Sequence, residues 1–546
     1  MTSIIAGSMK TELLRRTKAD IQKAGALLRQ GQVVGIPTET VYGLAANALD
    51  ADAVLRIFEA KGRPQDNPLI IHISALEQLE ELAEDVSPAV YRMAEHFWPG
   101  PLTMVVKKKA IVPDRTSAGL DTVGIRMPSH PVARAIIDAA GLPLAAPSAN
   151  TSGKPSPTTA RDVLDDMDGK IPAIVDGGAC TVGVESTVVD MTGDYPQVLR
   201  PGAITEEMIA EAMGQATTDK ATLEGLSDDA KVRSPGMKYR HYAPKAPVIL
   251  FEGAPWDTFC KVLEEMQQPW TGVICFEEFL PAIKESKSRL VYSLGYSWDH
   301  AEHARRLFAL LRKFDRTHAR RIVVQCPRTM GANAGTVNRL RKAAGFQSVD
   351  CRQGRRIIGV TGRSGSGKSL LSLRLEQLGA QVLDADKVYA QLLKQDCPMT
   401  RMLEHHFPGV WKDGVLDRKK LADRVFSDPE ALRTLNLITH SQVKAHMHYT
   451  VAHSHSRLIV LDVPLLFESG IDQLCDVTLA VLADREGSLA RIMKRDGIDR
   501  SRAEARLNSQ PDDAFYRARA DLLLENKGDL ADFEAKIDTF VEKYCK

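Results

Sequence analysis

Short apolar runs alternate with helical patterns over the first part of the chain. Residues 32–36, 69–73 and 102–106 are apolar runs typical of buried strands. Residues 51–60 and 132–140 carry apolar side chains at helical spacing. Strands that alternate with helices are typical of α/β folds. We therefore predict an α/β domain with a twisted sheet over residues 10–230.

The same pattern restarts after a polar, proline-rich stretch. Residues 247–251 and 321–325 predict strands, and residues 257–266 and 300–313 predict helices. These segments indicate a small Rossmann-like α/β domain over residues 247–350. Residues 231–246 form a predicted linker with the sequence Ser234-Pro-Gly-Met-Lys-Tyr-Arg-His-Tyr-Ala-Pro244. Its density of aromatic and imidazole side chains is unusual for a spacer.

A phosphate-binding sequence marks the start of a third domain. Residues 356–361 predict a buried strand, and residues 369–378 predict a helix with Leu371, Leu375 and Leu378 on one face. Between them, Gly362-Arg-Ser-Gly-Ser-Gly-Lys-Ser369 fits the pattern G-x-x-x-x-G-K-[ST]. A P-loop normally opens its domain, so we predict a P-loop domain with a parallel sheet over residues 355–546 and a fusion of two enzymes.

The P-loop residues have defined chemical tasks. Backbone N–H groups of such a loop surround phosphate oxygens, the lysine neutralises their charge, and the hydroxyl after it binds Mg²⁺. We therefore expect ATP to be bound by Gly362, Ser364, Gly365, Ser366, Gly367, Lys368 and Ser369, with Ser369 also binding the metal.

Two further features follow the P-loop. Asp386 could accept a proton from an attacking hydroxyl, although by position alone a helix N-cap is equally compatible. Arg491, Arg495, Arg500, Arg502 and Arg506 crowd one helical region, which is typical of either a solvated face or a lid that closes on phosphates.

Composition narrows the class of protein. The formal net charge is +1, which indicates no particular partner. Eight cysteines without a C-x-x-C pair make a structural zinc site unexpected and favour a reducing compartment. There is no N-terminal apolar segment and no long apolar run, so we expect a cytoplasmic protein without membrane association.

Four polar clusters lie near predicted strand or helix ends in the first domain. They are Pro37-Thr-Glu-Thr-Val-Tyr-Gly-Leu44, Lys61-Gly-Arg-Pro-Gln-Asp-Asn-Pro-Leu69, Ala146-Pro-Ser-Ala-Asn-Thr-Ser-Gly-Lys-Pro-Ser156 and Gly183-Val-Glu-Ser-Thr-Val-Val-Asp190. Such side chains suit a cleft for a polyanion, in which Lys61 and Arg63 would supply charge. Each cluster alone is equally compatible with turns or solvated loops. The sequence contains no Ser/His/Asp elbow, metal-ligand cluster or GxGxxG.

The third domain resembles dephospho-CoA kinase. The landmarks are T-G-x-x-G-S-G-K-S, D-A-D, G-x-L-D-R, V-P-L-L-F-E, the arginine-rich segment with Gln510, and Ala520-Asp521 followed by Asn526. The resemblance implies phosphorylation of the ribose 3′-hydroxyl of dephospho-CoA by Mg·ATP, with Asp386 and Lys368 as catalytic residues and Arg491 and Arg495 in the lid. Arg363, Ala390 and Ser441 depart from the family pattern, which puts the efficiency of this half in question.

Residues 10–350 resemble the threonylcarbamoyl-AMP synthase family in its longer form, with a YrdC-like domain and an extra C-terminal domain. The motifs are K-G-R-P-x-x-N-P-L, S-A-N-x-S-G-x-x-S-P-T, the linker, and Gly331-Ala-Asn-Ala-Gly-Thr-Val-Asn338. The resemblance implies conversion of L-threonine, bicarbonate and ATP into threonylcarbamoyl-AMP and pyrophosphate, for the t6A modification of tRNA.

The resemblance also implies site residues. Threonine contacts are expected at Thr40, His72, Arg126, Ala146 and Ser186. ATP contacts are expected at Arg63, Asn67, Thr122, Ser148, Ser156 and Arg200, with Lys61 added because of its charge and Tyr242 because the linker is expected to fold over the nucleotide.

The sequence thus predicts a bifunctional enzyme that uses ATP and Mg²⁺ at both sites. Its other expected partners are L-threonine, bicarbonate and dephospho-CoA, with a downstream t6A transferase complex as a possible recipient of the first product. The alternative is an RNA-binding YrdC-like module fused to an active or degenerate P-loop kinase. Near-neutral charge disfavours it, so we expect no direct stable nucleic-acid binding.

Overall fold

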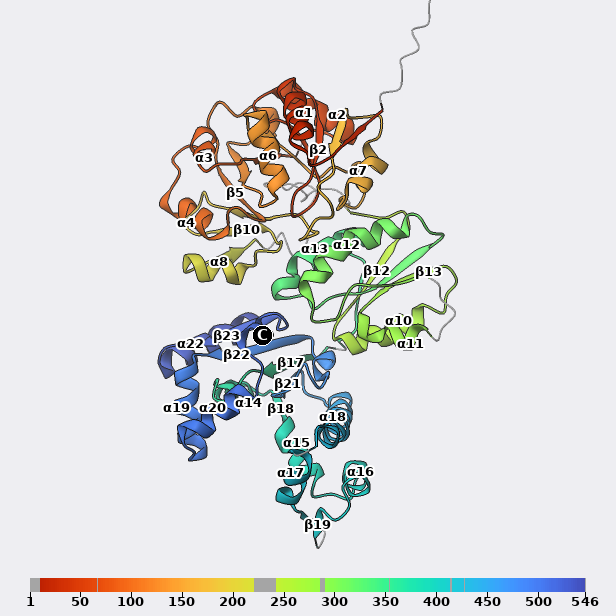
Figure 1. Cartoon of the computed structure of the whole chain (residues 1–546), viewed down its shortest axis with the longest axis vertical. Coiled ribbons are helices and arrows are strands. Elements are labelled where there is room, and N and C mark those ends of the chain that lie inside the picture. Colours follow the sequence, from red (N-terminus) through yellow and green to blue (C-terminus); the bar gives the residue numbers. More distant parts are fainter. Residues whose placement is uncertain are drawn as a thin grey trace, which may run out of the picture. The chain divides into compact units, whose positions relative to one another are not determined.

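The computed structural model describes residues 10–65, 67–219, 242–284, 290–352, 354–412, 415–426 and 428–545 (Figure 1). The chain divides into two compact units. Unit 1 comprises residues 1–251 and 261–349, and unit 2 comprises residues 252–260 and 350–546. Linker residues 231–241 lie outside the described residues, which resume at Tyr242.

The larger sheet of unit 1 has eleven strands within the described residues, in the order β1-β8-β2-β3-β7-β4-β6-β5-β9-β10-β11. The strands are β1 (Glu12–Leu14), β2 (Val34–Ile36), β3 (Gly43–Asn47), β4 (Ile70–His72), β5 (Leu102–Lys107), β6 (Thr122–Arg126), β7 (Leu144–Ala145), β8 (Ala173–Val175), β9 (Thr187–Asp190), β10 (Gln197–Arg200) and β11 (Thr217–Thr218). Parallel and antiparallel neighbours are mixed, as in the pairs β4–β6 and β5–β6.

Helices pack on both faces of this sheet. They are α1 (Lys18–Arg29), α2 (Ala51–Lys61), α3 (Glu77–Leu82), α4 (Pro88–Phe97), α5 (Asp114–Ser117), α6 (Pro131–Ala140), α7 (Ala160–Met167) and α8 (Glu206–Met213). Helices α1 and α6 lie side by side and share one hydrophobic core with β1, β2 and β8 (Figure 1). Helices α2, α3, α4 and α7 contribute to a second core. Strand residues alternate between the two cores: Ala173 and Val175 of β8 belong to the first and Ile174 to the second, as the strand's period of two requires.

The second sheet of unit 1 has the order β14-β13-β15-β12-β16, and its β12–β15, β13–β15 and β13–β14 pairs are parallel. Its strands are β12 (Val248–Glu252), β13 (Thr271–Cys275), β14 (Val291–Ser293), β15 (Arg321–Gln325) and β16 (Ser348–Asp350). The helical segments around it are α10 (Pro255–Glu265), η1 (Glu277–Phe279), α11 (Leu280–Lys284), α12 (His300–Phe314), η2 (Gly331–Asn333) and α13 (Ala334–Ala343). Residues 252–260, which the sequence places in the small domain, cluster with unit 2.

Unit 2 is built on a parallel sheet in the order β18-β21-β17-β22-β23. Its strands are β17 (Arg356–Thr361), β18 (Gln381–Asp384), β21 (Leu458–Asp462), β22 (Val477–Ala483) and β23 (Leu522–Asn526), with a separate hairpin of β19 (Trp411–Lys412) and β20 (Val415–Leu416). Its helical segments are α14 (Lys368–Gln377), α15 (Ala385–Leu392), α16 (Pro398–His406), α17 (Arg418–Phe426), α18 (Pro429–Ala452), η3 (Ile471–Leu474), α19 (Arg485–Asp496), α20 (Arg500–Asn508), α21 (Asp513–Arg517) and α22 (Leu530–Tyr544).

The α/β fold class predicted from the sequence is confirmed, and one packing prediction is wrong. Helix α14 buries Leu371 and Leu375, but Leu378 is 50% exposed. Leu378 is the C-cap, one residue beyond the last turn of the helix, where the chain turns away from the buried face.

Candidate functional site

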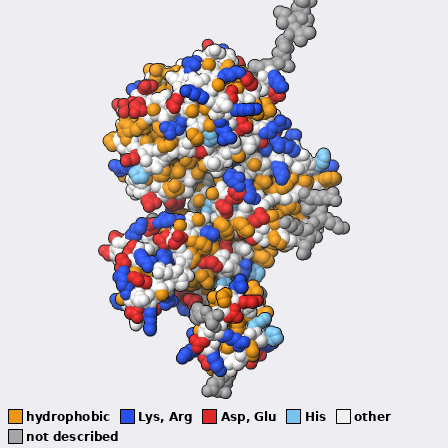
Figure 2. Space-filling view, in the orientation of Figure 1, with side chains coloured by type: hydrophobic (Ala, Val, Ile, Leu, Met, Phe, Trp, Pro, Cys, Tyr) orange, Lys and Arg blue, Asp and Glu red, His pale blue; other side chains and the backbone are white. Residues whose placement is uncertain are grey.

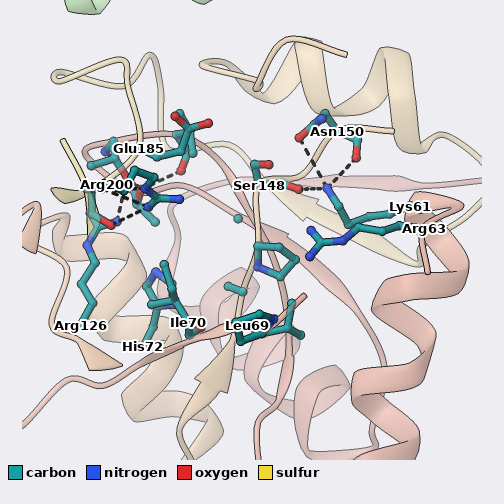
Figure 3. Close-up of a pocket in the computed structure, with 18 of the residues that line it drawn as sticks. Lys61, Arg63, Leu69, Ile70, His72, Arg126, Ser148, Asn150, Glu185 and Arg200 are labelled. Atoms are coloured by element: carbon teal, nitrogen blue, oxygen red, sulfur yellow. Dashed lines mark hydrogen bonds between the residues drawn. The ribbon is translucent and has the colours of Figure 1, made fainter. Parts of the chain in front are cut away.

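Loops at strand ends of the larger unit 1 sheet surround a cavity, which we call the N-terminal cavity (Figure 3). It contains about 780 Å³ of space between atoms, open solvent included. Its lining includes Thr40, Lys61, Arg63, His72, Arg126, Ala146, Ser148, Glu185, Ser186, Arg200 and Tyr242. All five residues predicted to bind threonine are therefore at one cavity.

Strand pairing places His72 and Arg126 next to each other. The two residues are register partners at the ends of the parallel strands β4 and β6. Arg126 is buried, and its Nη1 donates to Thr40 Oγ1 at 2.9 Å while its Nη2 pairs with Glu39 Oε1 at 2.6 Å. Each terminal guanidinium nitrogen carries a second N–H, so Arg126 keeps donors for an anionic ligand.

The imidazole of His72 is neutral. Burial, followed by the charge of Arg126, lowers the pKa of His72 to about 3. Its Nδ1 lies 3.2 Å from the carbonyl oxygen of Ile70. A neutral imidazole beside Arg126 adds no second positive charge and can exchange hydrogen bonds with a bound ligand.

Lys61 and Arg63 lie on the side of the cavity opposite Arg126 and Arg200 (Figure 3). The ammonium group of Lys61, at the end of α2, donates to the backbone carbonyls of Ser148 and Asn150. Burial lowers the pKa of Lys61 well below its usual value. Its contacts hold the Ser148–Asn150 loop, whereas Arg63 is half-buried at the cavity wall.

Arg200 and Ser186 form a second polar group in the cavity. Arg200 donates to the Ser186 carbonyl oxygen through Nε at 3.1 Å and Nη2 at 3.0 Å, and to Ser186 Oγ at 3.2 Å. Tyr242 lies beside them, with its ring 5.1 Å from that of Phe308. Tyr242 belongs to the predicted linker and lines the cavity.

Three of the predicted ATP-binding residues are not among the residues that line the cavity. Thr122 begins β6, at the opposite end of that strand from Arg126. Asn67 is fully buried, and both polar atoms of its amide lack a hydrogen-bond partner among the described residues. Ser156 is also fully buried, and its hydroxyl donates to Glu185 Oε1.

In unit 2, the P-loop joins strand β17 to helix α14 as the motif requires. Gly365 and Gly367 have positive φ values of 74° and 110°. A Cβ at Gly365 would lie 2.6 Å from the Ser488 carbonyl oxygen, so only glycine fits there. The Lys368 ammonium donates to the carbonyls of Gly362 at 2.6 Å and Arg363 at 3.0 Å. Burial lowers the pKa of Lys368 to about 8.

The N-cap of helix α15 is Asp384, which leaves the carboxylate of Asp386 available for another task. Asp384 Oδ1 accepts from the backbone N–H groups of Asp386 at 2.9 Å and Lys387 at 3.1 Å. Asp386 instead lines a cavity of about 820 Å³, open solvent included, with Tyr389, His440 and Leu465. Burial, followed by the charge of Asp384, raises the pKa of Asp386.

Asp462 is a functional candidate that the sequence reasoning missed. It ends β21, beside the P-loop strand, and is the register partner of both Val360 and Asp384. Its Oδ2 accepts from Ser372 Oγ at 2.7 Å, and burial raises its pKa. The sequence offered one sign of this role, because the apolar run 458–461 predicts a buried strand and Asp462 follows it. Ligands of parallel sheets bind at the carboxyl ends of strands.

The two predicted lid arginines differ in position. Arg491 Nε donates to the Gly365 carbonyl oxygen at 2.6 Å, so it contacts the P-loop directly. Arg495 is exposed and pairs with its neighbour Asp496 at 2.7 Å. Arg506, which was not predicted to be a lid residue, also pairs with Asp496. Its positive charge contributes to lowering the pKa of Lys368 and opposes the rise in the pKa of Asp386. Gln510 Oε1 accepts from the backbone N–H of Ser364 at 2.9 Å.

The described residues contain no helix long and apolar enough to cross a membrane. In the same part of the chain, no group of three or more His, Cys, Asp or Glu side chains is arranged to hold a metal ion. All eight cysteines are free thiols.

Family models cover most of the chain. The model described as "Telomere recombination" (Sua5/YciO/YrdC) matches residues 26–202. The model described as "Threonylcarbamoyl-AMP synthase, C-terminal domain" matches residues 204–345, and that of dephospho-CoA kinase matches residues 356–532.

Individual relatives agree with these matches. Threonylcarbamoyl-AMP synthases of Pyrococcus abyssi and Bacillus subtilis are both 46% identical, over 60% and 62% of this chain and 95% and 97% of their own lengths. A dephospho-CoA kinase of Fusobacterium nucleatum is 40% identical over 28% of this chain and 80% of its own length.

A solved structure extends the comparison to the fold. The crystal structure of P. abyssi Sua5 complexed with L-threonine is 43% identical, with a TM-score of 0.57, and covers 62% of this chain and 99% of that one. Residues up to about 345 therefore belong to the threonylcarbamoyl-AMP synthase family, and the chain from residue 356 onward belongs to the dephospho-CoA kinase family.

Proposed function

We propose that the chain is a bifunctional enzyme. Its first half forms L-threonylcarbamoyladenylate from L-threonine, bicarbonate and ATP, and its second half phosphorylates the 3′-hydroxyl of dephospho-CoA with ATP. The observation that carries the first activity is the gathering of Thr40, His72, Arg126, Ala146 and Ser186 around one cavity. The second rests on the P-loop that follows β17 and on Asp386, which lines a cavity in unit 2.

In the N-terminal cavity, Arg126 and Thr40 receive the carboxylate of threonine. The amine nitrogen then attacks the carbon of bicarbonate and water leaves, which forms a carbamate. A carbamate oxygen attacks the α-phosphorus of ATP, and the bond from that phosphorus to pyrophosphate breaks. The step depends on alignment and on neutralising the phosphate charge, which Arg63 and Arg200 supply from opposite sides (Figure 3).

Four residues complete the proposed ATP side of this cavity. Ser148 and Tyr242 line it, and Asn67 and Ser156 are buried residues that are not among its described lining. Lys61 acts by holding the Ser148–Asn150 loop rather than by free charge, because carbonyl oxygens already surround its ammonium group. Thr122 lies at the opposite end of β6 from Arg126.

In unit 2, Asp386 is the proposed general base. Its carboxylate takes the proton of the ribose hydroxyl as that oxygen attacks the γ-phosphorus, and ADP leaves. A pKa raised toward the working pH suits a base. Lys368 and Arg491 contact the P-loop carbonyls and are placed to bind the phosphates that the loop surrounds.

The residues present fit Mg²⁺ at the kinase site. Burial raises the pKa of both Asp462 and Asp386; the charge of Asp386 contributes to raising the pKa of Asp462, and a divalent cation relieves such repulsion. Ser369, Asp462 and ATP phosphate oxygens would hold the ion, which would neutralise charge on the transferred group. The N-terminal cavity offers less, because Glu185 is the one acidic side chain among its described lining residues and already accepts hydrogen bonds from Ser156, Arg339 and Tyr242.

Paired variants test the two activities. Purified protein is assayed for pyrophosphate with ATP, threonine and bicarbonate, and for ADP with ATP and dephospho-CoA. Arg63→Ala should abolish only the first activity and Lys368→Ala only the second. Loss of both activities in either folded variant would contradict two independent sites.

An RNA-binding module is the competing hypothesis for the first half. It predicts tight, salt-sensitive tRNA binding without ATP turnover. On the face that Figure 2 shows, Lys and Arg side chains are interspersed with Asp and Glu rather than gathered into one basic surface. We therefore expect the product, rather than the enzyme, to reach the t6A transferase machinery.

A further inference from the structure

A buried carboxylate joins three separate segments beside the N-terminal cavity. Glu185 is 7% exposed and immediately precedes Ser186. Its Oε1 accepts from Ser156 Oγ, and its Oε2 accepts from Arg339 Nε at 2.9 Å. The Tyr242 hydroxyl is a third hydrogen-bond partner. Burial would raise the pKa of Glu185, but Arg339, Arg200 and Ser156 together outweigh it and lower that pKa, so the group is ionised.

The cation that pairs with Glu185 comes from the small domain. Arg339 lies on α13 and is fully buried. Its Nη2 donates to the backbone carbonyl of Glu185 at 3.2 Å, and its Nη1 donates to the carbonyls of Gly335 and Pro201. One guanidinium therefore fixes the side chain and the main chain of Glu185 together with the turn that follows β10.

Close helix packing supports this arrangement. A Cβ at Gly335 would lie 2.9 Å from Gly202 Cα, so α13 approaches the turn after β10 as closely as a backbone allows. Glu185 and Pro201 are the chain neighbours of Ser186 and Arg200, which line the cavity. Arg339 is itself absent from the lining among the described residues.

We propose that Arg339 is a positioning residue of the synthase reaction, which acts through Glu185 to hold Ser156, Ser186 and Arg200 in the geometry that aligns the α-phosphorus of ATP. This role rests on the proposed function of the cavity. A misplacement of about 1 Å in such a site can cost on the order of a hundredfold in rate. Arginine is required because only a planar fork can contact the carboxylate and three separate carbonyl groups at once.

The test uses the full chain and steady-state pyrophosphate release. Arg339→Met should lower kcat/KM for ATP by about ten- to a hundredfold. Without Arg339, the enclosed Glu185 should take up a proton more readily, so the variant's rate should gain a new dependence on pH that rises toward alkaline pH. Arg339→Lys should recover only part of the loss.

The double variant Glu185→Gln/Arg339→Met separates positioning from stability. It removes the uncompensated charge, so it should fold and lose the new pH dependence, yet its kcat/KM for ATP should stay low. Arg316→Met serves as the matched control, because Arg316 is an exposed arginine of the same domain that pairs with Asp165 at 2.5 Å. Kinase activity of each variant reports whether unit 2 of the same molecule is intact.

Two outcomes would overturn the proposal. One is a folded Arg339→Met protein with the wild-type kcat/KM for ATP and pH profile. The other is a double variant that regains full activity as soon as it regains stability, which would make Arg339 purely structural. A wild-type protein that released no pyrophosphate with threonine and bicarbonate would instead refute the proposed function.

Discussion

At the residue scale, environment decides which of several similar side chains can do chemistry. Asp384, Asp386 and Asp462 are all aspartates near the P-loop. Asp384 caps a helix and Asp462 accepts from Ser372, while Asp386 faces a cavity. The two cations of the N-terminal cavity also differ in environment. Lys61 is surrounded by carbonyl oxygens, whereas Arg63 is half-buried. Residue type alone does not distinguish these roles, because hydrogen-bond partners decide them.

Replacement of Asp384 should shift the pH profile of the kinase. The base form of Asp386 is required, so the rate should rise with pH through the pKa of Asp386. The charge of Asp384 contributes to raising that pKa, so Asp384→Asn should move the acid limb to lower pH. Asparagine also caps helices well, which keeps α15 in place.

The measurement is kcat against pH for wild type and variant, with Asp396→Asn as the control. Asp396 is an exposed aspartate that pairs with Arg401, and its replacement should leave the limb unmoved. An unchanged acid limb in Asp384→Asn would mean that Asp384 has no influence on the group that titrates.

At the element scale, the P-loop depends on how closely it packs against α19. Gly365→Ala would force a positive φ on a side-chain residue and place its Cβ 2.6 Å from the Ser488 carbonyl oxygen. Strain of about 1–3 kcal/mol is typical of such positions. We expect KM for ATP in the kinase reaction to rise by at least about tenfold, with the synthase reaction unaffected.

Gly379→Ala is the matched control for this variant. Gly379 also has a positive φ, of 91°, but a Cβ there meets no atom within 4 Å. It carries the backbone strain without the collision. Equal losses in the two variants would show that backbone conformation, rather than contact with α19, limits the loop.

Much of the element structure could be predicted because local patterns determine it. The strand at 356–361 and the helix after the P-loop were predicted to within one residue, since apolar runs and a local motif define them. The family resemblance implied five threonine-binding residues, and all five line one cavity, although only Thr40, Ala146 and Ser186 lie in the polar clusters. Leu378 was misassigned because spacing alone does not reveal where the last helical turn ends.

The missed residues depend on contacts between distant positions. Glu185 and Arg339 are 154 positions apart, and no periodicity links them. Arg339 lies between the buried Val337 and Leu340 on α13, so its burial could have been suspected from the apolar neighbours, but its partner could not. Asp462 became a candidate only when the strand order placed it beside β17 and β18.

At the scale of the whole molecule, each activity has a cavity within its own compact unit. Among the described residues, none proposed for one reaction lines the other cavity. The two reactions share ATP but no intermediate. The molecule is therefore best described as two enzymes joined by a chain.

Independence of the two sites predicts the behaviour of mixed variants. When Arg63→Ala and Lys368→Ala proteins are combined, each activity should return in proportion to the molecules that keep that site. The measurement is pyrophosphate and ADP release across a series of mixing ratios. A rate that falls below this proportion would mean that one half needs the other half of the same molecule to be intact.

The Glu185–Arg339 pair also decides where the chain can be shortened for laboratory use. A fragment that stops before α13 would keep the Glu185 carboxylate but lack its partner, the Arg339 guanidinium. Breaking a buried ion pair by removing one partner typically costs about 3–5 kcal/mol of stability. A usable synthase fragment therefore has to extend through Ala343.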